Sequence, residues 1–132
     1  MKLNVRRLRD EDYKTISQWW AKWKWPVIPK ENLPPTGLIV EKGDVSIVSR
    51  YIYITNSKGA LLEWIVSNPE YREEDRSKAI ELLIVSAENM LKDQGITYIF
   101  SIGRNKHLIE THKKLGWLVD DKPSYEMTKV IN

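Results

Sequence analysis

The strongest constraint on the fold lies in residues 65–83, which read IVSNPEYREEDRSKAIELL. A β-rich run ends at Pro69, a charged turn follows, and an amphipathic helix begins after the turn. A strand that ends just before a helix presents unpaired backbone N–H groups at the positive end of the helix dipole. Such a place suits a phosphate, but phosphate-binding turns usually carry glycines, and this turn carries Glu73, Glu74, Asp75 and Ser77.

Composition limits the class of protein. The 132 residues suffice for one core, so we expect residues 1–132 to form a single domain. The absence of cysteine excludes disulfides, thiolate metal sites and a cysteine nucleophile, and it favours a cytoplasmic protein. No apolar run of about 18 residues and no signal-peptide pattern is present, so we expect a soluble protein. The net charge of +3 favours anionic ligands only mildly and is small for a nucleic-acid-binding protein.

Hydrophobic patterning predicts nine elements in the order β-α-β-β-β-α-β-α-β. The expected elements are a strand at 3–8, a helix at 10–23, strands at 37–42, 44–55 and 60–67, a helix at 75–92, a strand at 96–102, a helix at 105–115, and a final strand or bent pair at 117–131. The predicted fold class is α/β (α+β), with a mixed, mostly antiparallel central sheet of six or seven strands flanked by helices. The strands on either side of the second helix should be parallel neighbours.

This element order, with the segments NPEYREEDRSKAIELL and NKHLIETHKKLGW, resembles the GNAT superfamily of acetyl-CoA-dependent N-acetyltransferases over nearly the whole chain. The family's coenzyme motif is an arginine or glutamine, two residues, a glycine, one residue, and a glycine or alanine. Arg72, Asp75 and Ser77 fall on these positions, so only the arginine matches. The family's second motif is similar to Asn105 and the later segment HKKLGW, in which His112 replaces a frequent tyrosine. The spacing of NPEYR and DR also resembles small phage-encoded members.

The resemblance implies direct transfer of an acetyl group from acetyl-CoA to a primary amine. A carboxylate or a water chain must take the proton of the amine, and Glu63 is the candidate base; the alternative is a solvent-facing residue on a half-exposed strand. Backbone N–H groups near Ile65 and Val66 would polarise the thioester carbonyl. His112 would give a proton to the leaving thiolate, or it is a structural residue on an apolar helix face.

The resemblance also implies a coenzyme site at the start of the second long helix. The expected coenzyme-binding residues are Arg72, Asp75, Arg76, Ser77 and Lys78, with Asn105 near the other end of the coenzyme. The alternative is that Asp75 caps the helix while Arg76 and Lys78 pair with neighbouring glutamates. A carboxylate at Asp75 would repel a pyrophosphate unless it turned away.

Four of the six tryptophans lie within residues 19–25. Trp20 and Trp23 fit the buried face of the predicted helix, whereas Trp19 and Trp25 fall off it, so we expect these two to be exposed and to contact substrate. Tryptophans interleaved with lysines also suit stacking on nucleic-acid bases.

Three functions remain open from the sequence. The first is an acetyl-CoA-dependent N-acetyltransferase acting on a small-molecule or protein amine, with no metal. The second is a GNAT-like binding module whose coenzyme binding is weakened or lost. The third, and least favoured, is a small nucleic-acid-binding protein. The sequence leaves the oligomeric state open, with a homodimer among the alternatives.

Overall fold

The computed structural model describes all 132 residues, which form two compact units, residues 1–102 and residues 103–132. The two units are described in turn, and the expectation of a single domain stays a prediction. None of the helices combines the length and the apolar character that a membrane crossing requires.

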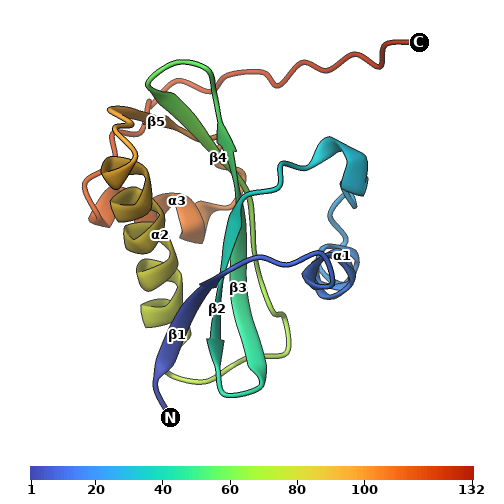
Figure 1. Ribbon diagram of the computed structural model, residues 1–132, viewed down its shortest axis with the longest axis vertical. Helices are drawn as coiled ribbons and strands as arrows, with labels where there is room; N and C mark the ends of the chain where they lie inside the picture. The colour runs from blue at the N-terminus through green and yellow to red at the C-terminus, as the bar shows by residue number, and fades with distance from the viewer. The chain divides into compact units, whose positions relative to one another are not determined.

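The first unit is built on a five-stranded sheet (Figure 1). The strands are β1 (Leu3–Arg7), β2 (Gly37–Lys42), β3 (Val45–Ile54), β4 (Gly59–Ser67) and β5 (Tyr98–Phe100). They lie side by side in chain order, and every pair is antiparallel except β4 and β5, which are parallel. The predicted mixed, mostly antiparallel sheet and the parallel pair across the second helix are thus confirmed.

Helices α1 (Asp12–Lys22) and α2 (Arg76–Asp93) lie on opposite faces of this sheet (Figure 1). The short 3₁₀ helix η1 (Lys30–Asn32) belongs to the proline-rich loop after α1. The core on the α1 face consists of Ile16, Trp19, Trp20, Ile39, Tyr51 and Val66. The buried residues of α2 recur at helical spacing and are Ala79, Ile80, Leu83, Ile84, Ala87 and Leu91.

Local contacts explain where α1 starts and where α2 ends. Both Asp12 oxygens accept from the Arg6 guanidinium, at 2.8 and 2.9 Å, and the Arg9 N–H donates to Oδ2 at 2.7 Å, which ties the start of α1 to β1. At the end of α2, Gly95 adopts φ 79°, a left-handed conformation that suits glycine. The N–H of Ile96 then donates to the carbonyl of Leu91 at 3.0 Å, which closes the helix.

The second unit contains helix α3 (Lys106–Lys114) and no strand. The Asn105 side chain accepts from the N–H of Leu108 at 3.1 Å, so it caps α3, and Gly116 ends the helix at φ 96°. The predicted final strand at 117–131 is therefore wrong, and the sheet has five strands instead of six or seven. A turn held by Asp120, whose Oδ1 accepts from the N–H of Lys122, interrupts this segment, and residues 103–132 offer no other strand for pairing.

Candidate functional site

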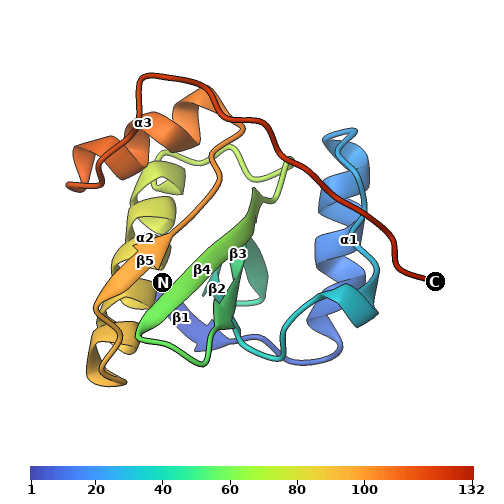
Figure 2. The same ribbon diagram turned by 90° about the horizontal axis from the view of Figure 1, so that it is seen from above.

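The ladder between β4 and β5 is short compared with β4 itself. Its pairs are Gly59 with Tyr98, Ala60 with Ile99, and Leu61 with Phe100. β4 continues to Ser67 with no partner strand on this side, and Figure 2 shows β5 beside only the first part of β4. We call this region, formed by β4 beyond Leu61 and by Ser101 and Ile102 after β5, the β4–β5 opening. Alternate peptide groups of β4 point toward this unpaired edge.

A bulge in β4 lies within the opening. Trp64 has φ 59°, which is uncommon for a bulky residue, and the register between β3 and β4 shifts beside it, between Ser49 and Tyr51. The Trp64 indole N–H donates to the hydroxyl of Tyr53 at 2.8 Å. Backbone strain of this kind persists only where the surrounding structure holds it, and it is concentrated at functional sites.

Glu63 is buried at the opening, so the alternative of a solvent-facing residue is wrong. Its Oε1 accepts from the N–H of Ile102 at 2.9 Å and from the hydroxyl of Ser101 at 3.1 Å. The Ser101 hydroxyl in turn accepts from Nη2 of Arg50 at 2.9 Å. Arg50 was not among the predicted site residues, although a charged residue in the apolar run of residues 45–54 is a signal that could have found it. The role of Glu63 as a base stays a prediction.

The β4 residues expected to polarise a carbonyl lie along the same opening. Ile65 is half-buried, and Val66 is buried in the core on the α1 face and paired with Ser49 of β3. The structure therefore brings Ile65, Val66 and Glu63 together on the unpaired length of β4. The use of their N–H groups in catalysis stays a prediction.

The start of α2 offers free backbone donors. The N–H groups of Ser77 and Lys78 have no backbone acceptor, as is usual in the first turn of a helix. Both side chains are exposed. Together with the helix dipole, these N–H groups form a place that favours an anion.

Asp75 turns away from these donors. Its Oδ2 accepts from Nζ of Lys42 at 2.8 Å, and its Oδ1 accepts from the hydroxyl of Tyr71 at 2.6 Å. Asp75 makes no side-chain cap on α2, so the capping alternative is wrong. The hydrogen bond from Lys42, and then that from Tyr71, hold the pKa of Asp75 below its ordinary value, so the carboxylate stays ionised. Lys42 was missed because it lies 33 positions away in the chain.

Two arginines flank the same turn in different surroundings. Nη2 of Arg76 donates to the hydroxyl of Ser67, the last residue of β4, at 3.2 Å, while its buried Nε has no partner. Burial, and then the nearby charge of Arg72, lower the pKa of Arg76. Arg72 itself is exposed and lies 5.9 Å from the ring centroid of Trp23, in cation–π range.

The tryptophan-rich segment is packed more deeply than predicted. Trp19 is only 4% exposed, so its expected exposure is wrong: α1 buries the adjacent Trp19 and Trp20 together against the sheet. Trp25 is half-buried and stacks on Trp23, with ring centroids 5.7 Å apart. The Trp23 indole N–H donates to the carbonyl of Ser67 at 2.7 Å, which links this segment to the end of β4.

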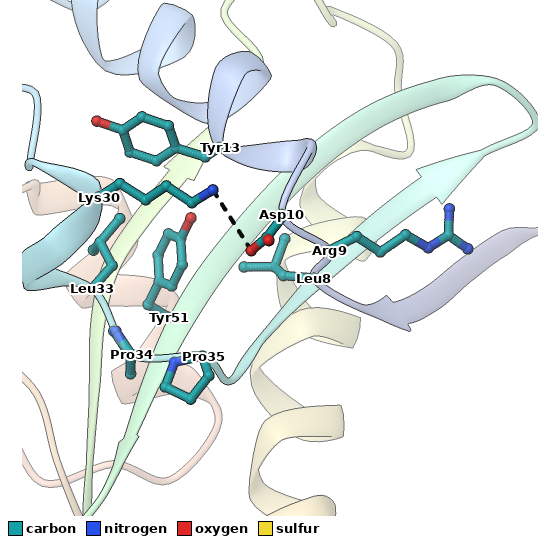
Figure 3. Close-up of a pocket in the computed structure, with 9 residues that line it drawn as sticks. All are labelled: Leu8, Arg9, Asp10, Tyr13, Lys30, Leu33, Pro34, Pro35 and Tyr51. Atoms are coloured by element: carbon teal, nitrogen blue, oxygen red, sulfur yellow. Dashed lines mark ion pairs between the residues drawn. The ribbon is translucent and has the colours of Figure 1, made fainter.

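A pocket of about 250 Å³ lies on the α1 face of the sheet (Figure 3). Its lining residues are Leu8, Arg9, Asp10, Tyr13, Lys30, Leu33, Pro34, Pro35 and Tyr51. Nζ of Lys30 lies 3.6 Å from Oδ1 of Asp10, and the hydroxyl end of Tyr51 points toward this pair (Figure 3). Burial raises the pKa of Tyr51 to about 12, so its hydroxyl stays protonated. None of these residues was predicted, since they come from segments far apart in the chain.

The remaining predicted residues belong to the second unit. Nδ1 of His112 lies 2.6 Å from the carbonyl oxygen of Leu108, and the His112 ring meets that of Trp117 edge-on, with centroids 4.9 Å apart. Asn105 uses its side-chain oxygen to cap α3. The predicted roles of His112 in proton transfer and of Asn105 in coenzyme binding stay predictions.

Comparisons with known proteins agree with this architecture. No protein-family model and no curated protein matches the sequence. Among solved structures, an aminoglycoside acetyltransferase from an uncultured soil metagenomic sample, in complex with sisomicin, is similar, with 9% identity, a TM-score of 0.72, and coverage of 98% of this chain and 97% of that one. The PaiA N-acetyltransferase of Thermoplasma acidophilum, in complex with coenzyme A, has 20% identity, a TM-score of 0.66, and coverage of 93% and 94%.

A third similar structure is the ribosomal-protein-S18-alanine N-acetyltransferase of Escherichia coli, with 15% identity and a TM-score of 0.63. This likeness covers 87% of this chain and 77% of that one. The chain described here therefore has the fold of the GNAT acetyltransferases, as the sequence predicted.

Proposed function

We propose that this protein is an acetyl-CoA-dependent N-acetyltransferase. The observation that carries the proposal is the β4–β5 opening, where the ladder stops at Leu61 and Phe100 although β4 continues to Ser67. An unpaired strand edge can take the amide groups of an extended ligand as a further strand would. The pantetheine arm of coenzyme A carries two amides and suits this edge.

The start of α2 supports the same coenzyme. Its two free N–H groups and the basic side chains of Arg72 and Arg76 suit the pyrophosphate. The buried Nε of Arg76, which has no partner, is a further donor at this place. Asp75 does not oppose the anion from the first turn of α2, because Lys42 and Tyr71 bind its carboxylate.

The pocket in Figure 3 is our candidate for the acceptor site. The Asp10 carboxylate can hold a cationic amine in place of Lys30, and the protonated hydroxyl of Tyr51 can donate to the rest of the acceptor. The acceptor class we infer is a small polar molecule with a primary amine. Such an acceptor agrees with the aminoglycoside sisomicin bound in one similar structure.

The reaction we propose is one acyl transfer. The neutral amine attacks the thioester carbonyl, a C–N bond forms and the C–S bond breaks. The nitrogen loses one proton and the thiolate of coenzyme A gains one, so no oxidant or reductant is involved. Glu63 or water is the proposed base.

Titration calorimetry and thermal unfolding with acetyl-CoA, against a matched salt control, test the proposal. We expect micromolar affinity, which at 100 times Kd would stabilise the fold by about 2.7 kcal/mol. Release of free thiol with sisomicin, or with a peptide that begins with alanine, would then identify the acceptor class. No binding at millimolar acetyl-CoA would refute the enzyme and favour a GNAT-like binding module, consistent with Asp75 and Ser77 in place of glycines.

A further inference from the structure

We propose that Glu63 is a positioning residue that holds the β4–β5 opening apart, a role that rests on the function proposed above. The neighbouring strands pair in register up to Leu61 and Phe100, and the ladder stops there. Two residues beyond this last pair on each strand, the N–H of Ile102 donates to Oε1 of Glu63 at 2.9 Å. A side-chain carboxylate thus takes the place that a carbonyl of β4 would have in a continued ladder.

The carboxylate also prevents the strands from closing. A β4 carbonyl could pair with Ile102 only if the two backbones approached to normal strand spacing, about 4.8 Å. The Glu63 side chain is long enough to accept from the Ile102 N–H while the two backbones stay apart. Pairing of the two strands at this point would therefore add no hydrogen bond for that N–H. The Trp64 bulge, with its left-handed φ of 59°, breaks the regular alternation of β4 directly after Glu63.

A buried cation fixes the carboxylate in this position. The Ser101 hydroxyl accepts from Nη2 of Arg50 at 2.9 Å and donates to Oε1 of Glu63 at 3.1 Å, so the three groups form one directed chain. Arg50 is only 1% exposed, and burial lowers its pKa to about 10. The charged groups that face Arg50 are Glu63 of β4 and Glu88 of α2, and both favour its charged form.

This role differs from that of a catalytic base in what a substitution should change. Loss of a base would slow acetyl transfer and leave coenzyme affinity intact. Loss of a positioning group would change the width of the opening, and therefore the affinity for acetyl-CoA.

Three variants separate the oxygen acceptor of Glu63 from its charge. Glu63→Ala removes both, Glu63→Gln keeps an oxygen acceptor, and Glu63→Asp keeps the charge but withdraws it by one methylene. Glu110→Gln, an exposed position on α3, is the matched control. Acetyl-CoA affinity is measured by titration calorimetry, and the exchange rate of the Ile102 amide proton by NMR.

We expect Glu63→Ala and Glu63→Asp to speed Ile102 exchange and to weaken acetyl-CoA binding at least about tenfold, because the β4 donors and acceptors that would meet the coenzyme are misaligned. Glu63→Gln should stay within about threefold of the wild type in affinity, although its melting temperature falls with that of Glu63→Ala because Arg50 loses a counter-charge. If Glu63→Ala does not fold, Glu63→Asp carries the test.

Two results would overturn the proposal. One is wild-type affinity in both Glu63→Ala and Glu63→Asp, or in Glu63→Asp alone if the alanine variant does not fold. The other is equal loss in Glu63→Gln and Glu63→Asp. The proposed function fails in a different way, if the wild-type protein does not bind acetyl-CoA. In that case the exchange rate still tests Glu63, because rapid exchange of the Ile102 amide proton in the wild-type protein would refute its positioning role.

Discussion

At the scale of single residues, Asp75 shows how one contact decides what a site can bind. The carboxylate lies at the position that directly precedes α2, where the resemblance to the coenzyme motif predicts a glycine. Lys42, from the end of β2, neutralises it and draws it aside, and Tyr71 holds its second oxygen. The acidic residue at this position is therefore compatible with the proposed anion binding, because a cation from another element binds it.

Removal of the Lys42 cation should leave the negative charge of Asp75 uncompensated. In Lys42→Met the Asp75 carboxylate loses its cationic partner and keeps only Tyr71. We expect acetyl-CoA affinity to fall about tenfold, because two like charges near 4 Å repel each other. The double variant Lys42→Met/Asp75→Asn should recover most of this affinity in calorimetry. Lys92→Met, in the last turn of α2, is the matched loss of one positive charge. A double variant as weak as Lys42→Met alone would show that Lys42 binds the coenzyme directly.

At the scale of elements, α1 depends on one carboxylate for its attachment to β1. Asp12 is 7% exposed and binds both the Arg6 guanidinium and the N–H of Arg9. The Arg6 hydrogen bond is the main reason that the pKa of Asp12 lies below its ordinary value. This attachment sets the position of α1, and with it one wall of the pocket in Figure 3.

The stability of this attachment should depend on pH. Since the pKa of Asp12 is lower in the folded than in the unfolded chain, its contribution is fully present above about pH 4 and is lost as the pH falls through the folded pKa. We expect Asp12→Asn to lower the free energy of unfolding by about 1–3 kcal/mol at pH 7. Urea unfolding should show this difference shrinking toward pH 2, whereas Asp44→Asn, at an exposed turn, should change little at either pH. A constant difference across this range would contradict the account.

At the scale of the whole molecule, the proposed function places two ligands in different parts of the first unit. The coenzyme is assigned to the β4–β5 opening and the start of α2, and the acceptor to the pocket on the α1 face of the sheet. Tyr51 of β3 lines that pocket and is paired in register with Glu63 of β4. The sheet itself is therefore the shared wall of both sites.

Variants in the pocket should separate the two ligands. We expect Asp10→Asn to raise the KM of a cationic acceptor such as sisomicin about threefold, because the Asp10 side chain is 93% exposed and an exposed charge pair contributes only about 0.2–1 kcal/mol. The dissociation constant of acetyl-CoA should remain unchanged in the same variant. Glu11→Gln, on the adjacent exposed residue, is the control. Equal loss for both ligands would remove the pocket from the acceptor site.

The sequence predicted the parts of this fold that depend on local patterns. Alternating apolar runs and turn residues located β2, β3 and β4, and helical spacing located α1, α2 and α3 within two residues. Contacts between distant segments were not accessible in this way, which is why Lys42 beside Asp75 and Ser101 beside Glu63 were missed. Trp19 was misplaced because spacing within one helix does not show how wide a face the sheet will cover.

The short β4–β5 ladder also affects how the sheet forms. β2, β3 and β4 are neighbours in both sequence and space, whereas β5 reaches β4 only after the 30 residues of 68–97. Closing a longer loop costs more conformational entropy, and here the hydrogen bonds of only three residue pairs offset that cost. The last strand is therefore the part of the sheet that detaches at the lowest free energy. A ligand lying along β4 would supply the missing hydrogen bonds at the unpaired edge. It would thereby couple the folding of β5 to that of the other four strands in one cooperative step.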